Sequence, residues 1–220
     1  MIKIILNGYE VQCEEGQTLL DVTKLYGIDI PTLCFCEGLS PYGACRLCIV
    51  EVGKGNSSRL VTSCTYPVKE GIEVRTHSKK VVEVRKVILE LLLARCPNSK
   101  KLQDLAAKLG VNKVRFKTKQ EDCILCGLCV RMCEEQMMSG AIGFSQRGTI
   151  REVSNPFHKK SELCRECGAC MYICPVVEVQ CSGYKEKGEL CNRCLRYDIT
   201  CLNKYDDVKC FVESCGSCVR

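Results

Sequence analysis

The hydrophobic and polar positions at the start of the chain predict a β-hairpin. Two stretches rich in hydrophobic residues, Ile2–Leu6 and Tyr9–Cys13, flank the dipeptide Asn7-Gly8. This dipeptide is a strong signal for a two-residue turn between antiparallel strands. We therefore expect the chain to begin with two paired strands.

A short helix is predicted directly after this hairpin. Thr18 is placed to cap its first turn, and Asp21 is placed to complete a capping box. Gly27 follows the last hydrophobic residues and is expected to end the helix. A cysteine-containing loop and further strand-like stretches come next, so residues 1–77 read as one small unit of mixed helix and strand.

Two further helices are predicted in the middle of the chain. Over 78–95, hydrophobic residues recur at helical spacing with Lys, Glu and Arg between them. The expected apolar face consists of Val81, Val84, Val87, Ile88, Leu91 and Leu92. Asn98 or Ser99 is expected to cap a second helix that ends at Gly110 and turns Leu102, Leu105, Ala106 and Leu109 inward. Together these helices predict a helical connector over 78–115.

The composition favours metal binding over disulfide bonding. The chain has 22 cysteines in 220 residues, a fraction typical of disulfide-rich or metal-binding proteins. Its first residues, MIKIILNGYEVQ, show no basic segment followed by an apolar one, and no long uncharged apolar run exists. We therefore expect a cytoplasmic protein without a membrane span, in which cysteines bind metal.

The most informative pattern is C-x2-C-x2-C-x3-C, which occurs twice. The first copy reads CILCGLCVRMC and the second reads CRECGACMYIC, followed by Pro175. This is the spacing of a two-cluster bacterial ferredoxin, in which the fourth cysteine of each run ligates the other cluster. We therefore expect two [4Fe–4S] clusters within 116–180. The first is assigned to Cys123, Cys126, Cys129 and Cys174, and the second to Cys133, Cys164, Cys167 and Cys170.

A third cluster is predicted in the N-terminal unit. A hairpin, a helix, a cysteine loop and more strands suggest a β-grasp ferredoxin that holds a [2Fe–2S] cluster. The candidate ligands are Cys34, Cys45, Cys48 and Cys64. Gly43 and Ala44 are small where this loop must approach the cluster. Cys36 is interpreted as a bystander near the cluster, and Cys13 as a small core residue.

The stretches PTLC and LSPYGACRLCIVEV carry a resemblance to a known group of proteins. They resemble the amino-terminal ferredoxin domains of the large iron–sulfur subunit of NADH dehydrogenase and of iron-only hydrogenases. They also resemble the small diaphorase subunit of NAD-reducing hydrogenases. The resemblance covers roughly residues 1–180, and it implies an iron–sulfur subunit of a larger oxidoreductase. The extra cluster with one His and three Cys ligands that often occurs in these relatives is not expected, and Cys96 is interpreted as structural.

The last forty residues, 181–220, predict a small metal knuckle. Two CxxC pairs lie twenty residues apart, a spacing that suits a four-cysteine zinc site. The candidate ligands are Cys191, Cys194, Cys215 and Cys218. The alternatives are a further iron–sulfur cluster that uses Cys201 or Cys210, and a tail without metal. A metal would give this short charged segment a fold that it could not otherwise stabilise.

Nothing in the sequence indicates a substrate site. There is no G-x-G-x-x-G motif after a strand and no P-loop, and the two histidines, His77 and His158, are interpreted as surface residues. A chain with three redox centres and no substrate machinery is interpreted as an electron relay. The resemblance implies a flavoprotein that oxidises NAD(P)H on one side, and a hydrogenase, formate dehydrogenase or electron-bifurcating partner on the other.

Two other functions compete with the relay subunit. One is a free-standing polyferredoxin that exchanges electrons with several enzymes. The other is a zinc-ribbon protein that binds nucleic acid, suggested by the formal charge of +6. An oxidised cluster with its thiolates carries about two negative charges, so three clusters would cancel this excess.

The elements and cysteine patterns along the chain together predict an α+β fold class. The expected parts are a β-grasp domain, a helical connector, a two-cluster ferredoxin domain and a cysteine-rich tail.

Overall fold

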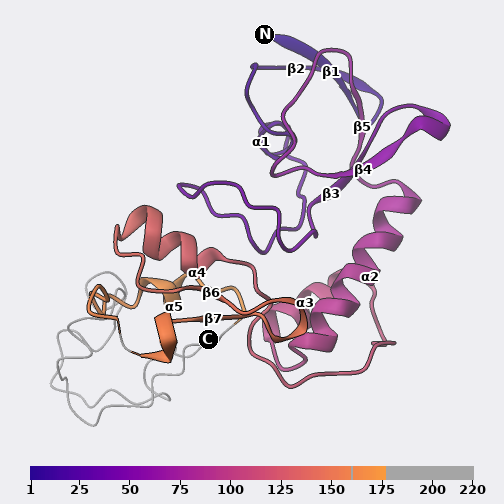
Figure 1. Cartoon of the computed structure of the whole chain (residues 1–220). Coiled ribbons are helices and arrows are strands. Elements are labelled where there is room, and N and C mark those ends of the chain that lie inside the picture. The colour runs from indigo at the N-terminus through magenta and orange to yellow at the C-terminus, as the bar shows by residue number, and fades with distance from the viewer. Residues whose placement is uncertain (160, 177–220) are drawn as a thin grey trace, which may run out of the picture. The chain divides into compact units, whose positions relative to one another are not determined.

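The computed structural model describes residues 1–159 and 161–176 and shows an α+β protein (Figure 1). The chain forms two compact units that divide between Cys126 and Gly127. The predicted tail ligands Cys191, Cys194, Cys215 and Cys218 lie outside the described residues. No helix in the described part of the chain is both long enough and apolar enough to cross a membrane.

The first unit is built on a five-stranded mixed sheet in the order β2-β1-β5-β3-β4. Its strands are β1 (Ile2–Leu6), β2 (Tyr9–Cys13), β3 (Ile49–Val52), β4 (Arg59–Thr62) and β5 (Glu73–Arg75). The predicted hairpin is confirmed: β1 and β2 are antiparallel, and Leu6 lies opposite Tyr9. Asn7 and Gly8 both have positive φ, as this tight turn requires. Strand β5 pairs in parallel with β1, which gives the mixed sheet of a β-grasp fold.

Helix α1 (Leu19–Leu25) packs on this sheet and closes the core. Thr18 and Asp21 form the predicted capping box, with both reciprocal hydrogen bonds present. Leu19, Leu20 and Val22 are fully buried against the inward residues of the strands. The backbone N–H of Leu20 donates to the carbonyl of Ser63, which ties the start of the helix to the segment before Cys64.

Two helices complete the first unit: α2 (Lys79–Arg95) and α3 (Lys100–Leu109). Ser99 and Gly110 bound α3 as predicted, and Gly110 takes the left-handed conformation. The predicted face of α2 is wrong except at Val81, which is fully buried. Its buried residues are Val81, Arg85, Leu89, Glu90, Leu93 and Ala94, whereas Leu91 is exposed. Apolar periodicity does not select Arg85 and Glu90, which are buried because each has a polar partner.

The second unit contains short elements around the cysteine runs. Its helices are α4 (Leu128–Arg131) and α5 (Ala169–Tyr172), and its strands are β6 (Gly143–Ser145) and β7 (Glu152–Ser154), which pair antiparallel. Single 3₁₀ or π turns occupy Met132–Gln136, Gly148–Ile150 and Pro156–His158, and one lies at Gly55–Ser57 in the first unit. Helices α4 and α5 pack against each other.

Candidate cluster-binding sites

Four cysteines meet in the interior of the first unit. Cys34, Cys45 and Cys48 come from the long loop before β3, and Cys64 comes from the turn after β4. None of the four is more than 4% exposed. These are the residues predicted from sequence for the [2Fe–2S] cluster, and the fold brings Cys64 to the other three across sixteen to thirty residues of chain.

The sulfur atoms of this group contact one another and are approached by backbone N–H groups. Cys48 Sγ lies 3.3 Å from Cys64 Sγ, and the backbone N–H of Cys45 donates to Cys34 Sγ at 3.4 Å. Cys34 also forms hydrogen bonds with the Cys45 and Cys64 thiols and with the backbone of Ala44. Donors that point at sulfur in this way stabilise thiolates and tune a bound cluster.

The proximity of the four thiols shifts their ionisation in opposite directions. Hydrogen bonds from Cys45 and Cys64 lower the pKa of Cys34 to about 2, and the hydrogen bond with Cys64 lowers the pKa of Cys48 to about 6. The pKa values of Cys45 and Cys64 are raised, first by their hydrogen bonds to Cys34. Four thiolates at this spacing repel one another unless positive charge lies among them. Ferric iron would supply that charge.

The loop that carries these cysteines takes a backbone shape that few residues tolerate. Gly43 has φ of +69°, and a Cβ atom there would lie 3.1 Å from Cγ2 of Thr65. The backbone conformation and the nearness of Thr65 therefore both favour a residue without a side chain at position 43. Arg46, between Cys45 and Cys48, also has positive φ, at 60°.

Two buried polar side chains lie near Cys48. The Oγ atom of Ser63 has no conventional hydrogen-bond partner in the described part of the chain, but the weak interaction of its hydroxyl with Cys48 lowers the pKa of that thiol. The Nε atom of Arg85 is likewise buried without a partner there. Buried polar donors beside a group of buried thiols fit an anionic cluster bound at the cysteines.

No group of three or more His, Cys, Asp or Glu side chains in the described ranges is arranged to hold one metal ion. A [2Fe–2S] cluster has a different requirement, because each of its two irons binds two cysteines. The Cys34 thiol is hydrogen-bonded to the Cys45 thiol, and Cys48 Sγ lies 3.3 Å from Cys64 Sγ, so two close pairs match that requirement. The donor chemistry therefore fits a two-iron cluster better than a single ion.

Cys13, Cys36 and Cys96, which belong to no predicted ligand set, lie outside this group. Cys13 is buried in the core, as predicted, where burial raises the pKa of its thiol. Cys36 is half-buried and donates to the carbonyl of Glu37. Cys96 is buried at the end of α2, where burial and then the charge of Cys123 raise its pKa to about 12. Burial keeps the Cys13 and Cys96 thiols protonated, which fits structural residues better than cluster ligands.

The two C-x2-C-x2-C-x3-C runs adopt the same backbone conformation. In the first, Leu125 and Gly127 have φ of 55° and 73°; in the second, Glu166 and Gly168 have φ of 52° and 72°. A short helix then begins at the residue after each glycine. Left-handed residues at these spacings curl the chain so that its N–H groups face inward, and the N–H of Leu125 does donate to Cys123 Sγ, at 3.3 Å.

Within the second unit, Cys133 lies near the second cysteine run. Burial raises the pKa of Cys170, and the charges of Cys133 and Cys167 raise it further. Cys133 comes from the end of the first run, so this proximity agrees with a fourth ligand that crosses to the other cluster. Cys129, Cys164 and Cys174 are each half-buried in the same unit, whereas Cys123 and Cys126 end the first unit.

The segment that leads to Cys123 is fixed to the end of α2. Arg95 donates through Nε to the carbonyl of Cys123 at 2.6 Å and also pairs with Glu121. The N–H of Lys119 donates to the carbonyl of Ala94 at 2.6 Å, and that of Glu121 to the carbonyl of Arg95 at 3.1 Å. Sequence reasoning missed Arg95, although a basic residue at the end of a helix close before a cysteine run was available as a signal.

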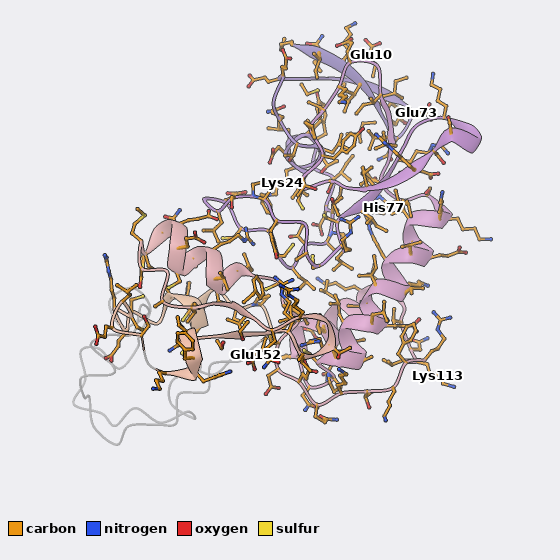
Figure 2. All side chains as sticks on the ribbon, viewed as in Figure 1. Glu10, Lys24, Glu73, His77, Lys113 and Glu152 are labelled. Atoms are coloured by element: carbon orange, nitrogen blue, oxygen red, sulfur yellow. The ribbon has the colours of Figure 1, made fainter. Side chains whose placement is uncertain are left out.

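Both histidines are exposed, as predicted. Figure 2 shows His77 at the link between β5 and α2, where its Nδ1 atom lies 2.7 Å from Oγ1 of Thr76. His158 lies in the second unit beside Glu152, with 3.3 Å between the ring nitrogen Nε2 and the carboxylate. Neither histidine is in reach of a thiol group that it could activate in the contacts that the structure describes.

Two segments of the chain match known iron–sulfur domains. Residues 1–79 match the family described as a 2Fe-2S iron-sulfur cluster binding domain. Residues 122–179 match the family described as a 4Fe-4S dicluster domain. The first match contains the group of four buried cysteines, and the second contains both C-x2-C-x2-C-x3-C runs.

Longer similarities extend over most of the chain. It is 32% identical to the NADH-ubiquinone oxidoreductase 75 kDa subunit of Reclinomonas americana over 80% of its length, and 31% identical to NADP-reducing hydrogenase subunit HndD of Solidesulfovibrio fructosivorans over 80%. It spans only 29% and 35% of those proteins. The NADPH-Fe(3+) oxidoreductase subunit alpha of Geobacter sulfurreducens is also 31% identical over 86% of this chain, which spans 25% of it.

A solved structure shares the fold. The crystal structure of NAD+-reducing [NiFe]-hydrogenase in the H2-reduced state contains a chain that is 28% identical, with a TM-score of 0.62. The match covers 70% of this chain and 74% of that one. The predicted resemblance is therefore confirmed: this chain is similar to subunits of NADH dehydrogenases and NAD(P)-reducing hydrogenases, and it contains a [2Fe–2S] domain followed by a [4Fe–4S] dicluster domain.

Proposed function

We propose that this chain is an iron–sulfur electron-transfer subunit of a multi-subunit oxidoreductase. It relays electrons between a flavoprotein subunit that oxidises NAD(P)H and a hydrogenase, formate dehydrogenase or electron-bifurcating partner. The observation that carries the proposal is the group of four buried, mutually contacting thiols in a β-grasp domain. The names of the similar proteins, which combine NADH or NADP chemistry with ubiquinone, iron or hydrogen, support the same assignment.

The first ligand set is Cys34, Cys45, Cys48 and Cys64 for one [2Fe–2S] cluster. Burial of all four sulfurs excludes water, and the backbone N–H groups of Ala44 and Cys45 orient Cys34 for ligation. The opposed pKa values of the four thiols mean that the group without a cluster holds protons that a bound cluster would displace. When bound, the cluster supplies one-electron oxidation and reduction.

The second and third ligand sets hold two [4Fe–4S] clusters. Cys123, Cys126, Cys129 and Cys174 form one set, and Cys133, Cys164, Cys167 and Cys170 form the other. The matching positive φ values in the two loops support this assignment, because they give each run the same inward curl. The nearness of Cys133 to Cys170 supports the exchange of fourth ligands between the runs.

The tail adds a candidate fourth metal site. Cys191, Cys194, Cys215 and Cys218 are proposed to bind zinc, which would have a structural role, or a further iron–sulfur cluster, which would extend the relay. The CxxC spacing supports either metal. A metal count decides between them, since the two alternatives differ by about four irons per chain.

The function is tested by isolating the tagged chain anaerobically from its native extract. We expect a flavoprotein to co-purify in stable proportion, and NADH or NADPH added to this complex to produce the EPR signals of reduced clusters. The Cys64→Ala complex should lose the [2Fe–2S] signal, whereas the matched Cys36→Ala complex should keep it. A chain that purifies alone, and whose clusters no pyridine nucleotide reduces in the extract, would support a free-standing polyferredoxin instead.

A further inference from the structure

Arg85 occupies an unusual position in the first unit. It lies on α2 at the same spacing as Val81 and Leu89, in the middle of the stripe that the helix buries, and only 1% of its surface is exposed. One guanidinium nitrogen donates to the carbonyl oxygen of Ile49 at 2.7 Å. Ile49 is the residue that follows Cys48 in the chain, so the hydrogen bond places the positive charge beside the proposed [2Fe–2S] site.

This guanidinium has no conventional counter-ion among the described residues. None of their carboxylates lies within 4.0 Å of it, and its Nε atom has no hydrogen-bond partner there. The charges that act on the pKa of Arg85 are those of Cys48 first and of Asp29 second, after the lowering effect of burial. Asp29 is exposed, so solvent screens its charge.

A buried charge without a partner is unfavourable and is usually compensated by an opposite charge close by. A [2Fe–2S] cluster with four thiolates carries about two negative charges when oxidised and one more when reduced. Such a cluster at Cys34, Cys45, Cys48 and Cys64 would lie next to Arg85 and would supply the missing partner. The buried hydroxyl of Ser63 approaches the same Cys48 thiol and provides a second polar group there.

We infer that Arg85 is the internal counter-ion of the [2Fe–2S] cluster and raises its reduction potential. The inference rests on the proposed ligand set. Reduction adds one electron from an external donor and breaks no bond in the protein, while Arg85 stays protonated in both states. Because the reduced cluster is the more negative, a fixed positive charge in this low-dielectric site stabilises it more than the oxidised cluster.

The test is an EPR-monitored redox titration of the full chain carrying its clusters, with dithionite as the electron donor. We expect Arg85→Met to lower the equilibrium constant for one-electron reduction of the [2Fe–2S] cluster at least tenfold, equivalent to about 59 mV. Arg85→Lys, which keeps the charge, should stay within about threefold of the wild type. Lys80→Met removes the same charge from an exposed position of α2 and should change little, because solvent screens that site.

The outcomes separate this inference from the proposed function. If the wild-type chain shows no [2Fe–2S] signal, the ligand set itself is wrong. If the signal is present and Arg85→Met titrates like the wild type, Arg85 is not the counter-ion. If the Arg85→Met chain does not assemble its [2Fe–2S] cluster, Arg85→Lys and Arg85→Gln are compared instead. A tenfold decrease of the reduction equilibrium constant in the Gln variant alone supports the inference, and equal decreases in both variants overturn it.

Discussion

Arg85 donates a hydrogen bond of 2.7 Å to the carbonyl of Ile49, so helix α2 is joined directly to the residue after Cys48. Ten residues further along the same helix, Arg95 donates to the carbonyl of Cys123 at 2.6 Å. The two arginines are thus separated by about 15 Å of regular helix. Since a helix is stiff over this length, α2 holds the loop of the proposed [2Fe–2S] ligands and the residue Cys123, at the start of the first cysteine run, at a fixed spacing.

Arg95 is predicted to matter for the first [4Fe–4S] site. Its side chain is 22% exposed and joins Cys123 and Glu121 to the end of α2. Replacement by alanine removes a charge-assisted hydrogen bond and should destabilise the loaded chain by about 2 kcal/mol. Chemical denaturation followed by cluster absorbance measures this effect. Lys79→Ala, at the exposed start of the same helix, is the control and should leave the denaturation midpoint unchanged. Equal losses of stability in both variants would contradict the role of Arg95.

Cys64 is predicted to be indispensable for the [2Fe–2S] cluster and irrelevant to the others. Cys64→Ala removes one of four buried sulfurs, so the chain should lose about two irons and keep about eight. Iron analysis combined with EPR of the reduced protein distinguishes loss of the [2Fe–2S] cluster from loss of the other clusters. Cys36→Ala serves as the control, because the Cys36 thiol donates to a carbonyl rather than to the other thiols. Loss of the cluster in the Cys36 variant would show that the ligand set has been misassigned.

Gly168 is predicted to be required for the shape of the second cysteine loop. It has φ of +72°, and no atom of the described residues lies within 4 Å of the position that a Cβ would take, so an alanine there meets backbone strain but no steric clash with them. The left-handed conformation costs an alanine about 1–2 kcal/mol, which should reduce the yield of fully loaded chains. Gly143→Ala is the matched control in the same unit, since Gly143 has neither positive φ nor close neighbours. Similar yields from the two variants would rule out the strain argument.

His77 is predicted to make folding pH-dependent near neutrality. Burial, followed by the charge of Arg85, lowers the pKa of His77 below its ordinary value of 6.5. Between the two pKa values the unfolded chain binds more protons than the folded chain, so stability falls as the pH drops below about 6.5. His77→Gln should reduce this loss in thermal melts at about pH 7 and about pH 5.5. The His158→Gln variant controls for the removal of a histidine; an unchanged slope in the His77 variant would refute the assignment.

Much of the first unit could be predicted because its local signals agree with its packing. The Asn7-Gly8 turn and the Thr18 capping box are local in sequence, and both occur as predicted. The face of α2 could not be predicted in the same way. Its buried stripe includes Arg85, whose burial depends on a carbonyl that is 36 residues away in the chain.

The cysteines of the candidate site could be predicted from the sequence, whereas the polar side chains around them could not. The group that contains Cys34 and Cys64 is predicted from its cysteine pattern together with the hairpin, helix and strands around it and the family resemblance. The polar groups that surround the sulfurs could not be selected, since Ser63 and Arg85 carry no motif of their own. Their role follows only from burial and from atoms that the fold brings close.

The electron-relay function is best tested by measuring iron, sulfide and zinc per chain in anaerobically purified protein, together with EPR of the reduced sample. A relay with the proposed ligand sets should give one [2Fe–2S] and two [4Fe–4S] signals and contain about ten irons per chain. About one zinc in addition would identify the tail as a zinc knuckle, and about fourteen irons without zinc would identify it as a further cluster. Little iron together with two or more zincs per chain would contradict the assignment of this protein as an electron relay.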